Sequence, residues 1–155
     1  MHLMCLYIMD FLFGRNFMKD ILYRIKEFAR KVEFFYVATS NQKGEVHLAV
    51  AKDLIFSPDN EQIVFKSWFC KKTIENIQKN PNISIAIYDA KTDIGYQIIG
   101  EAVSKNVVAV LNGYAPELEK IEKEYPQEEY QLKIKIINIM DLHRVIHSDK
   151  YLIGN

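Results

Sequence analysis

The sequence predicts a mainly β fold with peripheral helices, in which six antiparallel strands form a closed or nearly closed barrel. Short segments rich in β-branched and aromatic residues recur along the chain, separated by turn-forming Asn, Asp, Gly and Pro residues. Helical periodicity is confined to the start, the middle and a stretch before the last strand. The 155 residues have the size of one domain, and a hydrophobic content of 49% can fill one core.

The first half of the chain predicts a helix followed by strands. Residues 18–32 carry apolar side chains at helical spacing, with Lys, Arg and Glu on the other face. The turn-forming residues 41–44 join the next two strands as a hairpin. The six predicted strands span residues 34–39, 46–51, 62–67, 82–88, 94–103 and 130–136.

Two further helical segments interrupt the strands. Residues 71–79 predict a short amphipathic helix, which Pro81 prevents from continuing. Residues 106–129, with Leu118 and Ile121 among many charged residues, predict helix in two pieces. Residues 144–147 either prolong or follow the last strand.

The N-terminal residues do not fit a targeting or membrane segment. Residues 1–13 are apolar but are interrupted by Asp10, and the run is shorter than the roughly 20 residues that span a bilayer. Basic residues follow this run, and no signal-type cleavage site appears. We expect residues 1–17 to be an extension or an extra packed element, residues 18–155 to be the domain, and the protein to be cytoplasmic.

Charge and cysteine content restrict the possible partners. The 20 basic and 20 acidic residues balance, so no general field attracts nucleic acid or an anionic membrane. Any anion site must therefore be local. Cys5 and Cys70 form no metal-ligand pattern, as expected in a reducing cytosol, although a single disulfide between them stays open.

A basic segment between the third strand and the short helix is the strongest candidate site. Lys66, Lys71 and Lys72 lie close in sequence to the hydroxyl groups of Ser67 and Thr73. The first N–H groups of a helix are unpaired, so this combination suits a phosphate group. The alternative is that the lysines are solvated surface charges.

The other polar residues give weaker signals. His47 lies beside Ala49 and Ala51, which would let a flat ligand approach the strand, but a partly buried structural role is the alternative. His143 and His147 are four residues apart, and in a strand they would share no helical face. We therefore predict no metal site. The sequence contains no hydrolase motif.

Several short sequences occur in a distinctive order. They are Ala38-Thr39-Ser40-Asn41, Gly44, Val46-His47-Leu48-Ala49-Val50, Lys71-Lys72-Thr73, Asn76, Asn80-Pro81 and Gly95-Tyr96-Gln97-Ile98-Ile99-Gly100. Their combination resembles the pyridoxamine 5'-phosphate oxidase-like family of FMN-binding proteins. The resemblance implies a six-stranded split β-barrel that forms a homodimer, with FMN in a cleft between the subunits.

The resemblance also implies cofactor-binding positions. These are His47, Leu48, Ala49 and Val50 along one strand, Lys66 and Ser67 at the end of the next, Lys71, Lys72 and Thr73 on the phosphate, Asn76 nearby, and Gln97 at the flavin ring. The substrate-gripping C-terminal Arg and Trp segment of true pyridoxamine phosphate oxidases has no counterpart here. We therefore do not expect vitamin B6 synthesis. Related families bind a deazaflavin or haem, which remain alternative cofactors.

We expect a flavin-dependent oxidoreductase that accepts a hydride from a nicotinamide donor or a small organic substrate. No catalytic residue is assigned, although His47 and Tyr96 are candidates for proton relay. A protein that stores or senses flavin, deazaflavin or haem without turnover is the alternative. A barrel that binds nucleic acid through Tyr36, Phe65 and Trp68 is disfavoured by the zero net charge.

Overall fold

The computed structural model describes residues 18–57, 62–67, 70–111, 127–145 and 150–153. A helix occupies residues 18–29, and a second helix, α2, follows the third strand. Residues 1–17, predicted as an extension or extra element, lie outside the described part of the chain. The elements are β1 (Phe35–Ser40), β2 (Val46–Phe56), β3 (Gln62–Ser67), α2 (Lys71–Lys79), β4 (Asn82–Asp89), β5 (Ile94–Leu111), β6 (Gln127–Asp141) and β7 (Tyr151–Ile153).

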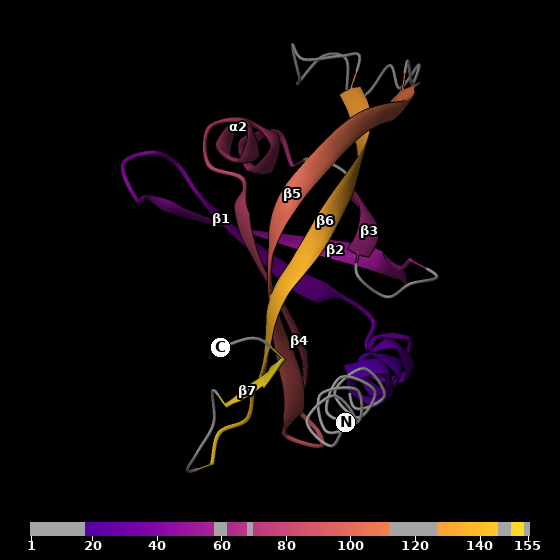
Figure 1. Ribbon diagram of the computed structural model, residues 1–155. Helices are drawn as coiled ribbons and strands as arrows, with labels where there is room; N and C mark the ends of the chain where they lie inside the picture. Colours follow the sequence, from indigo (N-terminus) through magenta and orange to yellow (C-terminus); the bar gives the residue numbers. More distant parts are fainter. Residues whose placement is uncertain (1–17, 58–61, 68–69, 112–126, 146–149, 154–155) are drawn as a thin grey trace, which may run out of the picture.

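The strands form one antiparallel sheet that curls into a barrel (Figure 1). Their order is β3-β2-β1-β4-β5-β6, and β3 also pairs with β6, from Gln62 opposite Lys135 to Ser67 opposite Tyr130. This second pairing closes the ring, so the predicted six-stranded barrel is confirmed. The sequence did not predict β7, a short seventh strand that pairs with the far end of β6.

The inner face of the barrel is almost entirely aliphatic and aromatic. Alternate residues of each strand point inward, because successive side chains in a strand project to opposite faces. These Ile-rich inner faces form the hydrophobic core of the barrel. The inward side chains with at most 1% exposure are Val37, Ile63, Phe65, Ile85, Ile87, Ile98, Leu132, Ile134 and Ile139.

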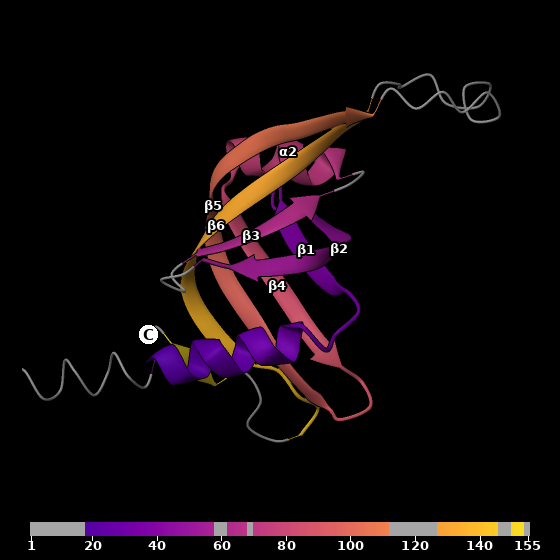
Figure 2. The same cartoon turned by 90° about the vertical axis from the view of Figure 1, so that its right-hand side faces the viewer.

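The two helices cover opposite ends of the barrel (Figures 1 and 2). The N-terminal helix buries Ile21, Leu22 and Ile25, and the ring of Phe28 meets that of Tyr96 edge-on at 5.4 Å. α2 instead packs against the end of β1. No helix in the described part of the chain is long and apolar enough to cross a membrane.

The prediction of helix over residues 106–129 is wrong where the structure describes it. β5 continues through Asn106 to Leu111, and β6 already begins at Gln127. The two strands stay paired as far as Leu111 opposite Gln127. The acidic stretch that suggested a helix lies outside the described residues, and Figure 2 shows β5 and β6 reaching past the barrel together.

The predicted hairpin turn between β1 and β2 is present. The Asn41 side-chain oxygen accepts hydrogen bonds from the backbone N–H groups of Lys43 and Glu45 at 2.9 and 3.0 Å. Gly44 adopts φ +80°, a conformation that costs other residues energy. This turn sets the register that pairs Thr39 with His47.

Candidate functional site

The start of α2 concentrates positive charge and unpaired donors. Lys71 and Lys72 are exposed at its first two positions, and Cys70 makes no side-chain cap hydrogen bond. The Ile74 N–H bonds back to the Cys70 carbonyl, whereas the three N–H groups before it lack partners within the helix. The Thr73 side chain is fully buried, and its hydroxyl has no partner among the described residues. This corner therefore suits an anion better than a neutral group.

The charge of Lys72 is partly offset by a neighbouring acidic residue. Lys72 Nζ lies 3.6 Å from Glu75 Oε2, and both side chains are about half exposed, at 55% and 50%. Exposed ion pairs of this kind contribute little to stability, because water and salt screen their attraction. An arriving phosphate can therefore compete with Glu75 for Lys72.

Buried polar contacts fix α2 to the barrel. The Asn76 amide donates to the Thr39 hydroxyl at 3.1 Å, and both residues are almost fully buried. One turn later, the Asn80 amide donates to the Ser40 hydroxyl at 2.9 Å. Because Thr39 pairs with His47, the half-buried His47 lies on the same side of the sheet as this helix contact. The structure thus brings His47 and Asn76 to the same end of the barrel as the α2 lysines.

Three other predicted strand residues, Leu48, Val50 and Gln97, project to the outer face of the sheet. Leu48 and Val50 are 60% and 56% exposed on the outer face of the sheet, beside Val46 at 74%. Gln97 lies on this outer face too, where its amide donates to the Ser84 hydroxyl at 2.9 Å. The strand pairings connect Leu48 through Ala38 to Ser84 across the face.

One part of the sequence interpretation is wrong. Ala51 is 7% exposed and belongs to the core, opposite Phe35, so no flat ligand approaches β2 at that position. Ala49 projects to the same inner face and pairs with the buried Val37. The reason is the two-residue period of a strand, which puts these alanines inside and their neighbours outside.

Two further pairs of residues from the sequence analysis are described only in part. Lys66 and Ser67 end β3, as expected, but their side chains lie outside the description. His143 Nε2 lies 3.3 Å from Asp141 Oδ2, while His147 is outside the described residues. Within the described residues, no group of three metal-binding side chains comes together.

A pocket at the other end of the barrel contains none of the predicted cofactor positions. Its volume is about 350 Å³, and it lies between the N-terminal helix, the start of β5, the end of β6 and β7. Tyr96, which the sequence analysis considered for proton relay, points into it, whereas its neighbour Gln97 points to the outer face. Four separate segments build this pocket, so no local motif could have revealed it.

Hydrogen bonds among Tyr88, Asp93 and Arg144, here called the polar clamp, stabilise one wall of this pocket. The Tyr88 hydroxyl donates to Asp93 Oδ1 at 2.6 Å, and Arg144 Nε donates to the same oxygen at 2.9 Å. These hydrogen bonds, with that of Tyr88 the stronger cause, lower the pKa of Asp93 below its ordinary value. The same bond to Asp93 raises the pKa of Tyr88. The clamp ties the segment after β6 to the turn between β4 and β5.

Comparison with known proteins gives one family and many similar folds. The family model for pyridoxamine 5'-phosphate oxidase matches residues 22–139. No curated protein matches the sequence.

Three solved structures illustrate the likeness in fold. An FMN-binding protein from Syntrophomonas wolfei subsp. wolfei is 16% identical, with a TM-score of 0.61 over 90% of this chain and 98% of that one. HupZ from Group A Streptococcus is 19% identical, with a TM-score of 0.59 over 83% and 97%. A pyridoxamine 5'-phosphate oxidase-related, FMN-binding protein from Nostoc punctiforme is 12% identical, with a TM-score of 0.57 over 80% and 82%.

Proposed function

The chain belongs to the pyridoxamine 5'-phosphate oxidase family, and from this premise we propose that it binds FMN and acts as a flavin-dependent oxidoreductase on a small substrate. The observation that carries the proposal is the start of α2. Its two lysines, its uncapped N–H groups and the unpartnered Thr73 hydroxyl match the needs of a phosphate monoester. Two of the similar structures are FMN-binding proteins by name.

The outer face of the sheet supports a place for the flavin ring between two copies of the chain. Val46, Leu48 and Val50 expose a continuous apolar row along β2. The side chains that the strand pairings align with this row are uncharged: Tyr36, Ala38, Ser84, Ala86, Gln97 and Ile99. An uncharged face of this kind favours burial against another protein surface. We propose that a second copy covers it, giving a homodimer with the cofactor at the subunit interface.

Gln97 is the polar group that suits the ring on this face. Its amide nitrogen is held by Ser84, which orients the side chain and leaves the carbonyl oxygen to accept a hydrogen bond from a ring N–H. His47 lies at the α2 end of β2, where a protonated imidazole would favour the phosphate. When bound, the flavin supplies the hydride chemistry, with NADH or NADPH as the proposed donor. A cytoplasmic location belongs to the proposal and agrees with the free thiol of Cys70.

The test compares FMN with riboflavin, which lacks the phosphate. The wild-type chain should bind FMN more tightly than riboflavin in a flavin-fluorescence titration. The variant Lys71→Ala/Lys72→Ala should lose about tenfold or more in FMN affinity, and with it the preference for FMN. Lys79→Ala, which removes a lysine from the other end of α2, serves as the control and should bind FMN normally.

Equal affinities of the wild type and the double variant would overturn the phosphate assignment. Steady consumption of NADH or NADPH by the FMN-loaded protein, with a suitable electron acceptor, would support the oxidoreductase. Tight FMN binding without turnover would instead assign the chain to flavin storage or sensing.

A further inference from the structure

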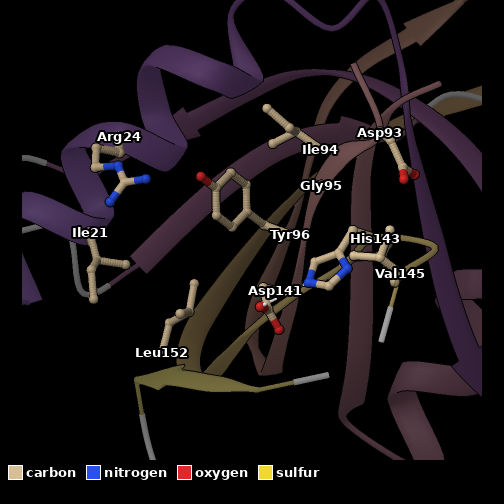
Figure 3. Close-up of a pocket in the computed structure, with 11 residues that line it drawn as sticks. Ile21, Arg24, Asp93, Ile94, Gly95, Tyr96, Asp141, His143, Val145 and Leu152 are labelled. Carbon is tan, nitrogen blue, oxygen red and sulfur yellow. Dashed lines mark ion pairs between the residues drawn. The ribbon is translucent and has the colours of Figure 1, made fainter. Parts of the chain in front are cut away.

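The pocket at the end of the barrel away from α2 is lined on one side by two polar side chains. Figure 3 shows the guanidinium group of Arg24, on the N-terminal helix, and the hydroxyl of Tyr96, on β5, pointing toward one another. Neither group has a hydrogen-bond or ion-pair partner among the described residues. Two donors without acceptors, one of them charged, therefore face the same space.

The acidic groups that line the pocket are already satisfied. Asp93 accepts from Tyr88 and Arg144, as described above. Asp141 accepts from the Lys150 backbone N–H at 2.6 Å through one oxygen and meets His143 at 3.3 Å through the other. Among the charged side chains that line the pocket, Arg24 is thus the one without a hydrogen-bond or ion-pair partner in the described part of the chain.

The remaining walls are apolar. They comprise Ile21 from the helix, Ile94 and the ring of Tyr96 from β5, Leu142 and Val145 after β6, and Leu152 from β7. A volume of about 350 Å³ lies toward the lower end of the range of small-molecule sites. Mainly apolar walls with a few convergent polar groups are the usual composition of such a site.

We propose that this pocket binds a small organic acid with an aromatic or branched aliphatic body. The carboxylate accepts hydrogen bonds from Arg24 and the Tyr96 hydroxyl, and the body packs against the apolar walls. This site is separate from the proposed cofactor site. It lies at the other end of β4 from α2, and β5 separates it from the outer face that carries Gln97.

The test uses naphthoate as the probe and neutral naphthamide as its matched analogue. Calorimetric titration of the full chain, with and without saturating FMN, should show one saturable naphthoate site in both states. The variant Arg24→Gln should weaken naphthoate binding about tenfold and leave naphthamide binding nearly unchanged, because it removes one charge-assisted hydrogen bond. Tyr96→Phe should weaken naphthoate less.

Two variants locate the bound probe. Arg30→Gln changes an arginine on the same chain segment that does not line the pocket and should leave the affinity unchanged. Val145→Trp places a large side chain at an exposed position of the pocket wall and should block binding without unfolding the protein.

Three results would overturn the proposal. The first is no saturable binding by the wild type. The second is equal naphthoate affinity in the wild type and Arg24→Gln. The third is naphthoate binding that FMN abolishes or that Val145→Trp leaves intact, since the probe would then occupy the cofactor site or another surface.

Discussion

The two helices that cover the ends of the barrel are held by different kinds of contact. At one end α2 is held through buried polar contacts, Asn76 to Thr39 and Asn80 to Ser40, and leaves lysines exposed. At the other end the N-terminal helix is held by buried aliphatic side chains and leaves a pocket beneath Arg24. Polar contacts fix direction as well as position, whereas apolar contacts mainly supply stability. We therefore expect the α2 end to suit an anion held in a fixed orientation, and the other end a mainly apolar ligand.

The largest expected effect comes from weakening the apolar closure. Ile25 is fully buried on the inner face of the N-terminal helix, so Ile25→Ala should destabilise the protein by about 2 to 5 kcal/mol through lost contacts and a cavity. Urea unfolding measures this loss. Tyr23→Ala, on the exposed side of the same helix, is the control and should change stability by less than about 0.5 kcal/mol. Similar losses in both variants would show that this helix does not close the barrel by burial.

An intermediate effect should follow at the polar end. Asn76→Ala leaves the buried Thr39 hydroxyl without its donor, which should cost about 1 to 3 kcal/mol in the same measurement. Gln78→Ala, on the exposed side of α2, should be nearly neutral. Combining Asn76→Leu with Thr39→Val should recover part of the stability, since no polar group is then left unpaired. If Asn76→Ala retained wild-type stability, α2 would not be fixed by this contact.

The smallest expected effect concerns the clamp beside the pocket, and it depends on pH. The pKa of Asp93 is lowered in the folded protein, so its bonds to Tyr88 and Arg144 stabilise the fold above the ordinary Asp pKa of about 3.9. This contribution is lost as the pH falls through the lowered value. Arg144→Gln should therefore destabilise the protein slightly at pH 7, with the difference shrinking below about pH 4.

Unfolding of the wild type and Arg144→Gln at both pH values measures this change. Arg24→Gln, whose arginine has no carboxylate partner in the described structure, should show no such pH-dependent difference. A difference between the wild type and Arg144→Gln that persists at low pH would contradict the assignment.

The same contrast explains what the sequence could predict. Lys71, Lys72 and Thr73 are consecutive, so their placement at the start of a helix followed from local pattern. The barrel followed from the spacing of strands and turns. The pocket could not be predicted, because Arg24, Tyr96, Asp141 and Leu152 meet only after the sheet has curled.

Two local errors have equally physical causes. The strand VHLAVAKDLIF has apolar residues on both faces, so alternation alone could not tell that Ala51 lies inside and Val50 outside. The stretch from Asn106 to Leu111 is a strand because it pairs with residues 127–131 of β6, with one irregularity between Val107 and Ala109. Such long-range pairing overrides a local helical preference.

The pairing of β3 with β6 has a consequence for how the chain folds. It joins residues 62–67 to residues 130–135, so the ring cannot close before most of the chain is available. Closing a loop of this length carries an entropic cost that neighbouring hairpins such as β1 with β2 avoid. High contact order of this kind slows folding. We therefore expect the hairpins to form early and ring closure to limit the folding rate, with the edges of β3 and β6 exposed to intermolecular pairing until then.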